Sequence, residues 1–472
     1  MSSSLAPPGP RIPLTVDATE ALGGNGDLVT EARFEKRGDR PALVIRLDVR
    51  KRNWRKVFGL PRGSRIRWEH VRDVEVQELS CLMGPIVYRI TIGDGCYVDA
   101  TGQRRYFGVD AMLPGLDLKR GVSMAVIRAA VLLAVVGGVG LRQVCWLLSM
   151  LFHIDVSSSS LDRWIAEAGD HLPDAEGMAK RLLADKPVTE AHFDEIFPQG
   201  RKGPVLVVRD EHGRILCAEE VEARDTVTVV GFLEKLKGWG FAFRTFYIDH
   251  CAAYAEAIPK VFPDARIQYD YFHILQNVWR TLWKTFVSYR KDIKRRARDA
   301  EDPVQRGILE ALAKRLWEKR GLIFTAEDNL TAEDRTELCA LVEHVPRLDA
   351  IRVFLNRVRG IFTDSNGELG ARQRLGRLQA LAEQQEPPAF AKVTKFLDGH
   401  FDNMITFLRV PDVKRNSLAE TGMRSLRRLE RGHDGFRTRE ARDRYLRLFQ
   451  AIRHFGWSVY RHDSSLALPA PA

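Results

Sequence analysis

The spacing of apolar residues changes several times along the 472-residue chain, and each change marks a predicted part of the fold. In residues 41–110, short runs such as ALVIRLDV and YRITIG alternate between apolar and polar positions. Alternation with β-branched residues is typical of strands that bury one face. We therefore predict a small β-rich module at 41–110. The preceding residues, 1–40, lack a sustained apolar period and are predicted as a flexible tail.

Helical spacing replaces this alternation in residues 121–172. Apolar segments at 126–136 and 141–152 predict two helices, and a third helix follows the serines that begin at Ser157. Serine is a favoured residue at a helix N-cap. Three short helices, the last of which carries Arg163, are typical of a helix-turn-helix region in outline. A three-helix linker bundle is the alternative interpretation.

The pattern becomes mixed in residues 186–287. Its order is three strands, helix, strand, helix, strand, helix, which predicts a mixed sheet with helices on its faces. Residues 288–408 are predicted to be almost wholly helical. Residues 409–460 are helical and rich in arginine, and a tail is predicted at 461–472.

Composition narrows the class of protein. The chain has 73 Lys and Arg against 62 Asp and Glu, a net charge of +11, which favours a polyanionic partner. Six cysteines in 472 residues are too few for a disulfide scaffold. They include no C-x-x-C pair, which excludes a cysteine zinc site of standard spacing. No signal peptide is evident, and the longest apolar run, 129–141, is too short to cross a bilayer. We expect a cytoplasmic protein that does not bind membranes.

Two aspartates are candidates for catalysis because each belongs to a predicted buried strand. Asp194 lies in HFDEIF, and Asp249 closes TFYIDH. Acids at strand ends usually project toward the crevice where ligands bind. Two carboxylates on neighbouring strands are the minimum for holding a divalent cation through oxygen ligands. The alternative is that each aspartate caps the turn that follows it.

Glu420 is the third candidate acid, and basic residues surround it. If the segment is helical throughout, Asn416 and Arg424 share one face with this glutamate. An exposed Glu–Arg pair is the alternative, and Glu430 is a rival for the role of third acid.

These segments together resemble a known family. HFDEIF, FYIDHCAAYAEAIPKVFPDARIQYDYFHILQNV and RNSLAETGMRSLRRLERGHDGFRT are similar to the DDE transposases of bacterial insertion sequences. The resemblance covers roughly residues 187–455. It implies an α/β fold with an RNase H-like catalytic core, a mixed sheet interrupted by a large α-helical insertion. It also implies that the catalytic acids are Asp194, Asp249 and Glu420.

Further residues are assigned through the same resemblance. Asp270 and His273 match the Asp-x-x-His of the family, and Asn416 matches its asparagine before the glutamate. These residues would orient the metal ligands without binding a metal ion themselves. For Asp270 and His273, a structural Asp–His pair is the alternative. Related transposases often begin with a cysteine zinc ribbon. The module at 41–110 is not one, so its role in recognising DNA ends stays open.

The resemblance implies phosphodiester chemistry with two Mg²⁺ ions, or Mn²⁺ in their place. Asp194 would bridge both ions, with Asp249 on one and Glu420 on the other. Water would cleave the transposon end, and the freed 3′-hydroxyl would attack the target DNA.

DNA contacts are predicted at two places. Sequence reading is expected from the third helix of 121–172, through Ser159 and Arg163. Phosphate contacts are expected from arginines near Glu420. These are Arg424, Arg427, Arg428, Arg431 and Arg437. A solvated helix face is the alternative for these arginines.

The sequence therefore predicts a DNA transposase that acts on double-stranded DNA as a homodimer or higher oligomer, in the cytoplasm and at the nucleoid. One alternative is an RNase H-like nuclease that cuts without joining strands. Another is a transposase-derived DNA-binding protein that lacks catalysis. An unrelated basic scaffold protein would leave the three acids without a role.

Overall fold

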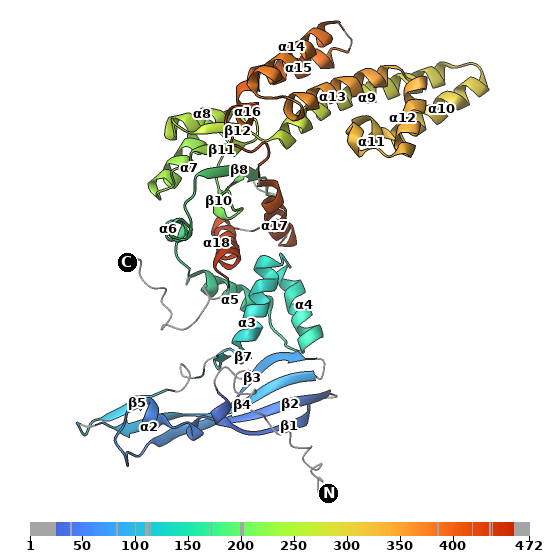
Figure 1. Cartoon of the computed structure of the whole chain (residues 1–472). Coiled ribbons are helices and arrows are strands. Elements are labelled where there is room, and N and C mark those ends of the chain that lie inside the picture. The colour runs from blue at the N-terminus through green and yellow to red at the C-terminus, as the bar shows by residue number, and fades with distance from the viewer. Residues whose placement is uncertain are drawn as a thin grey trace. The chain divides into compact units, whose positions relative to one another are not determined.

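The computed structural model divides the chain into two compact units (Figure 1). Unit 1 comprises Met1–Pro173 and Ser425–Ala472, and unit 2 comprises Asp174–Arg424. The structure describes residues 25–37, 40–81, 84–99, 101–108, 113, 115–170, 172–198, 203–384, 387–417, 419–433, 436 and 438–456.

Seven strands form one sheet in the described part of unit 1. The order is β1-β2-β4-β3-β7-β6, and β5 pairs with β4 outside this path. The strands are β1 (Val29–Arg37), β2 (Arg40–Asp48), β3 (Arg67–Cys81), β4 (Gly84–Val98), β5 (Arg104–Phe107), β6 (Leu116–Asp117) and β7 (Val122–Ser123). Their buried face packs around Trp54 of the short helix α2 (Trp54–Val57). The predicted β-rich module is therefore a sheet.

The tail predicted for residues 1–40 is too long, because β1 pairs with β2 from Val29 to Arg37. Within β1 only Ala32 is fully buried. Because β1 buries so little, its sequence lacks a regular alternation of apolar and polar residues, and the strand could not be predicted from that pattern. Residues 1–24 lie outside the described part of the chain.

The three helices predicted after this sheet are confirmed. They are α3 (Met124–Val131), which continues as a π-helical turn over Leu132–Val136, α4 (Leu141–Phe152) and α5 (Ser158–Asp170). His153, at φ 57°, ends α4 in the left-handed conformation. Ser157 Oγ accepts a hydrogen bond from Ser160 N (3.1 Å) and caps α5.

Unit 2 contains a five-stranded mixed sheet of order β10-β9-β8-β11-β12 among its described residues. The strands are β8 (Glu190–Ile196), β9 (Val205–Arg209), β10 (Ile215–Glu220), β11 (Thr245–Ile248) and β12 (Arg266–Tyr269). Strand β9 lies antiparallel to both β8 and β10, whereas β11 lies parallel to both β8 and β12. Helices α7 (Thr226–Gly238), α8 (Ala252–Val261) and α9 (Tyr271–Asp299) follow β10, β11 and β12. The predicted order of strands and helices is confirmed.

The remainder of unit 2 is helical, as predicted. After α6 (Ala175–Asp185), which precedes the sheet, come α10 (Pro303–Glu318), α11 (Arg320–Phe324), α12 (Ala332–His344), α13 (Arg347–Thr363), α14 (Glu368–Gln384), α15 (Ala389–Met404) and α16 (Thr406–Arg409). The predicted boundary between 287 and 288 falls inside α9, because its buried positions continue at helical spacing to Ile293 and Ala297. Thr406 Oγ1 donates to Ile267 O (2.6 Å), so the start of α16 contacts β12.

Two helices complete the fold. Helix α17 (Ala419–Gly432) crosses the boundary between the units, and α18 (Arg439–Phe455) belongs to unit 1. In unit 1 the end of α17 meets the turn before α4, where Gly138 has a φ of +62°. A Cβ atom at Gly432 would overlap the carbonyl oxygen of Gly138. Glycine at 432 is therefore required for this close backbone approach.

Candidate active site

Two strands of unit 2 bring the predicted aspartates to the same end of the sheet. Tyr247 of β11 pairs in register with His192 of β8, and their rings stack at 4.3 Å between centroids. Asp194 and Asp249 each lie two residues further along. Because side chains alternate along a strand, Asp194 shares the face of His192. The two predicted aspartates are therefore neighbours at the end of β11.

Each aspartate also accepts a backbone hydrogen bond. Asp194 is buried, and its Oδ1 accepts from Glu195 N (2.8 Å). Asp249 Oδ1 accepts from Cys251 N (3.0 Å) in the turn that leads into α8. The capping role considered for Asp249 is therefore present. It uses one carboxylate oxygen and does not preclude a ligand on the other.

A third carboxylate, which the sequence did not single out, lies on the opposite face of β8. Glu195 is buried, and its Oε2 accepts from the hydroxyl of Tyr254 (2.6 Å), while Arg224 binds Oε1. Arg224 Nη1 also lies 3.8 Å from Asp249 Oδ2. Burial raises the pKa of Glu195, and the charges of Asp249 and Asp194 raise it further. The signal was present in the consecutive acids of HFDEIF, because alternation turns one acid to each face.

The segment before α17 lies against the same face as the His192–Tyr247 pair. Lys414 N donates to the hydroxyl of Tyr247 (2.9 Å), and Ser417 Oγ lies 3.2 Å from His192 Nδ1. These contacts hold the chain three residues before Glu420. Glu420 belongs to α17, and its side chain lies outside the described part of the structure.

Asn416 does not share a helical face with Glu420, which corrects one expectation. Asn416 is exposed, and α17 begins only at Ala419. The hydrogen bonds of the neighbouring Lys414 and Ser417 to the sheet hold this segment in a non-helical conformation. Arg424 remains one turn after Glu420 within α17.

The Asp-x-x-His residues lie at the start of α9. Asp270 is buried and caps this helix, because its Oδ1 accepts from Phe272 N (2.9 Å). His273 and His400 both lie close enough to His250 to affect its pKa. Burial lowers the pKa of His250, and these two histidines lower it further, although Asp249 opposes them.

The predicted recognition helix α5 has one buried and one exposed face. Leu161, Trp164 and Ile165 are buried, whereas Ser159 and Arg163 are exposed. Arg163 Nη2 donates to Ser160 Oγ (3.3 Å). Arg163 also lines a pocket of about 320 Å³ together with Lys119, Arg120, Ser160, Trp164 and Glu167.

The arginines of α17 point away from its apolar stripe. Met423, Leu426 and Leu429 are buried. Arg424, Arg428 and Arg431 are exposed and Arg427 is half-buried, whereas Arg437 lies outside the described residues.

Glu430, the rival third acid, forms a buried ion pair within unit 1. Arg442 Nε donates to Glu430 Oε1 at 2.8 Å. Both side chains are buried, at 0% and 7% exposure. Glu430 thus has a structural role within unit 1.

The donor set at the end of β8 and β11 matches a magnesium site by type, since Mg²⁺ prefers carboxylate oxygens. Asp194 and Asp249 supply such oxygens from adjacent strands. Within the described residues no three His, Cys, Asp or Glu side chains gather closely enough to hold a metal ion. A complete metal centre here requires a further carboxylate, and Glu420 is the predicted one. The part of the chain that is described contains no helix long and apolar enough to cross a membrane.

Comparison with known proteins identifies the family of this chain. The model of a transposase family, the DDE transposases of the ISL3 type, matches residues 193–442, more than half of the chain. No curated protein matches the sequence. Among solved structures, the chain is similar to the Drosophila P element transposase strand transfer complex, with 14% identity and a TM-score of 0.33. That match covers 77% of this chain and 95% of the other. A TM-score this low does not establish a shared fold. The family match over residues 193–442 does establish the family, and the chain belongs to the ISL3-type DDE transposases.

Proposed function

We propose that this protein cleaves the ends of a DNA transposon and joins their 3′-hydroxyls to target DNA. The family supports transposition in general. The sheet of unit 2 supports an RNase H-like core, since three antiparallel strands are followed by two parallel ones in the order β10-β9-β8-β11-β12. The helices from α10 to α16, which lie between β12 and α17, are the proposed insertion within this core.

The proposed catalytic acids are Asp194, Asp249 and Glu420. The observation that carries this assignment is the contact of Ser417 Oγ with His192 Nδ1 at 3.2 Å. It brings the residues immediately before Glu420 to the face of β8 that also carries Asp194. This contact joins residues 225 positions apart and supports a site that Glu420 shares with the two aspartates.

These carboxylates would hold two Mg²⁺ ions, or Mn²⁺ in their place. When bound, the ions would activate the attacking oxygen and stabilise the charge of the leaving oxygen. The protein's own residues prepare the site. Arg224 lies between Glu195 and Asp249 and limits the repulsion between these two carboxylates. Asp270 begins α9 beside the site, and His273 lies one turn further along the helix. We assign both residues a positioning role.

Double-stranded DNA is the proposed partner, bound by a homodimer or a higher oligomer at the nucleoid. On α5, the exposed Ser159 and Arg163 lie opposite the buried residues, as a helix that reads base edges requires. Lys119, exposed in the same pocket as Arg163, would contact phosphate. The arginines of α17 would bind the backbone near the catalytic glutamate.

The decisive experiment is cleavage and joining of a labelled duplex that carries the element's own terminal sequence, in the presence of Mg²⁺. The wild type would be compared with Asp249→Ala, and DNA binding would be measured for both. We expect Asp249→Ala to abolish cleavage and joining while DNA affinity is retained. Equal activity in the two proteins would remove Asp249 from the mechanism. Cleavage without joining would identify a nuclease, and binding without either reaction would identify a DNA-binding protein.

A further inference from the structure

Helix α9 carries a row of exposed basic side chains beyond the proposed active site. Its members, which we call the α9 stripe, are Arg280, Lys284, Lys291, Lys294 and Arg298. All five side chains are exposed. In the part of the chain that the structure describes, none of the five forms an ion pair.

The stripe is continuous because its residues recur at helical spacing. At 100° per residue, the five positions lie within about 80° of one another around the helix axis. From Arg280 to Arg298 the helix rises by about 27 Å. The two acids of α9, Asp292 and Asp299, fall about 100–120° around the helix from Arg280. The acids of α9 therefore do not neutralise its basic face.

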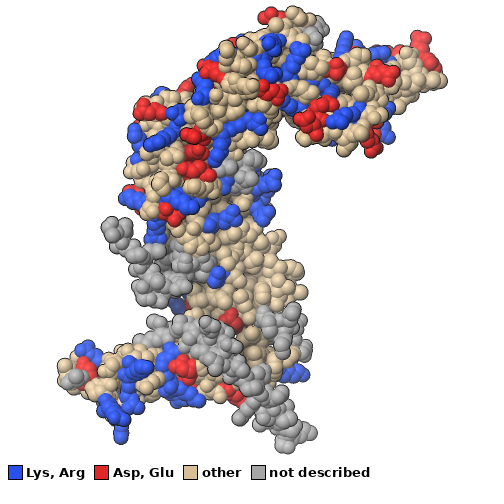
Figure 2. Space-filling view, viewed as in Figure 1, with Lys and Arg blue, Asp and Glu red and all other residues tan. Residues whose placement is uncertain are grey.

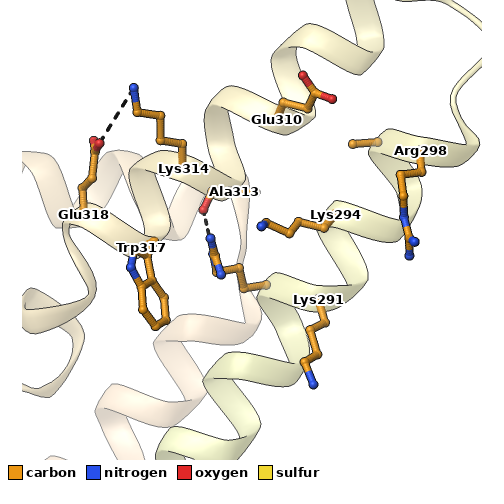
Figure 3. A pocket seen from close by; sticks show the side chains of 10 residues that line it. Lys291, Lys294, Arg298, Glu310, Ala313, Lys314, Trp317 and Glu318 are labelled. Atoms are coloured by element: carbon orange, nitrogen blue, oxygen red, sulfur yellow. Dashed lines mark hydrogen bonds and ion pairs between the residues drawn. The ribbon is translucent and has the colours of Figure 1, made fainter.

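A pocket of about 830 Å³ lies beside the stripe, between α9 and α10 (Figure 3). Lys291, Lys294 and Arg298 line it from α9, and Lys314 lines it from α10. Among the described residues that line it, the acids are Glu310 and Glu318, and Glu318 is paired with Lys314 at 4.0 Å. The pocket thus retains a positive charge.

Arg290 and Trp317 fix the wall of this pocket. Arg290 Nε donates to Ala313 O (3.0 Å), and its guanidinium lies 4.6 Å from the ring centroid of Trp317. The guanidinium of Arg320 lies 4.7 Å from the same ring. These contacts hold α10 against α9, so the basic groups project from a rigid pair of helices.

We propose that the α9 stripe and its pocket form a second DNA-binding surface, which holds the phosphate backbone of duplex DNA away from the catalytic acids. On the face of unit 2 seen in Figure 2, acidic and basic side chains are interspersed. A row of unpaired cations about 27 Å long exceeds the reach of a free phosphate or a nucleotide. Duplex DNA presents a negative charge every ~1.7 Å of its axis and matches such a row. The inference rests on the proposed function, in which DNA is the partner.

The test removes three cations of the stripe from the full-length protein, as Lys291→Gln, Lys294→Gln and Arg298→Gln together. A control triple variant, Arg377→Gln, Lys392→Gln and Lys395→Gln, removes the same residue types from exposed positions on α14 and α15. Affinity for a fluorescent duplex of random sequence is measured over a range of salt concentrations, without Mg²⁺. Each lost phosphate contact should reduce the slope of log K against log salt by about 0.9, so the stripe variant should lose about 2–3. The control should keep the wild-type slope.

A stripe variant with the wild-type slope would overturn the inference, as would an equal loss in both variants. Cleavage by the wild type is measured separately with Mg²⁺. If the wild type binds DNA through the stripe but does not cleave, the catalytic proposal fails and the stripe stands. If it cleaves but the stripe variant keeps its slope, the stripe fails and the catalytic proposal stands. A wild type that binds no duplex would overturn both.

Discussion

The hydroxyl oxygen of Ser417 lies 3.2 Å from Nδ1 of His192, although 225 positions separate the two residues. His192 is fully buried and stacks on Tyr247, whose hydroxyl accepts from Lys414 N. Two hydrogen bonds thus hold the strand ends against the segment that leads to Glu420. Residues far apart in the chain meet here at one end of a sheet.

Ser417→Ala tests whether this contact positions the proposed glutamate. We expect the cleavage rate to fall by about tenfold, because outer partners of a metal site typically contribute 10- to 100-fold. DNA affinity should stay unchanged. The measurement is single-turnover cleavage of a labelled transposon end, and Ser288→Ala, at an exposed position on α9, is the control. Equal rates in both variants would show that the contact has no positioning role.

Tyr254→Phe tests the buried environment of Glu195. The Tyr254 hydroxyl donates to Glu195 Oε2 at 2.6 Å, and its removal leaves a buried carboxylate oxygen short of a donor. We expect a loss of about 1–3 kcal/mol in the free energy of unfolding, measured by urea denaturation. Tyr445 is also buried, but its hydroxyl makes no hydrogen bond within the described residues. Tyr445→Phe should therefore cost less than about 0.5 kcal/mol. Equal losses would contradict this account of Glu195.

The buried pair Glu430–Arg442 should contribute to stability and not to catalysis. Arg442→Met alone removes the guanidinium that Glu430 binds at 2.8 Å in a buried site, and we expect a cost of about 3–5 kcal/mol. The double variant Glu430→Leu/Arg442→Met removes both charges and should recover most of this loss. A double variant that folds and still cleaves DNA would exclude Glu430 as the third acid. Loss of cleavage in a stably folded double variant would restore Glu430 as a candidate.

Gly432→Ala tests the close approach between α17 and the turn before α4. A Cβ at this position overlaps the carbonyl oxygen of Gly138, so we expect a loss of about 1–3 kcal/mol in unfolding free energy. Gly399 of α15 provides a matched control, because a Cβ there meets open space. Gly399→Ala should stabilise the protein by about 0.5–1 kcal/mol through helix propensity. Both variants are measured by thermal unfolding. An unchanged unfolding free energy in Gly432→Ala would show that the turn can move.

The sequence by itself determined the order of elements in unit 2 and the positions of the two aspartates. Buried strands such as β9, with the sequence VLVV before Arg209, are continuous apolar runs, and helices such as α9 repeat their apolar residues at helical spacing, so local pattern is enough. The same local reasoning fails for β1. That strand buries little beyond Ala32 and is recognised only through its pairing with β2.

Only the tertiary structure decided which distant groups meet. Hydrogen bonds to Tyr247 and His192 hold residues 414–417 out of the helix, so Asn416 leaves the face predicted for it. Partners such as Arg224 for Glu195 and Arg442 for Glu430 lie 29 and 12 positions away. No periodicity connects residues across such gaps, because their contact follows from strand pairing and helix packing. A sequence pattern shows which side chains face inward, and the fold determines what each of them contacts.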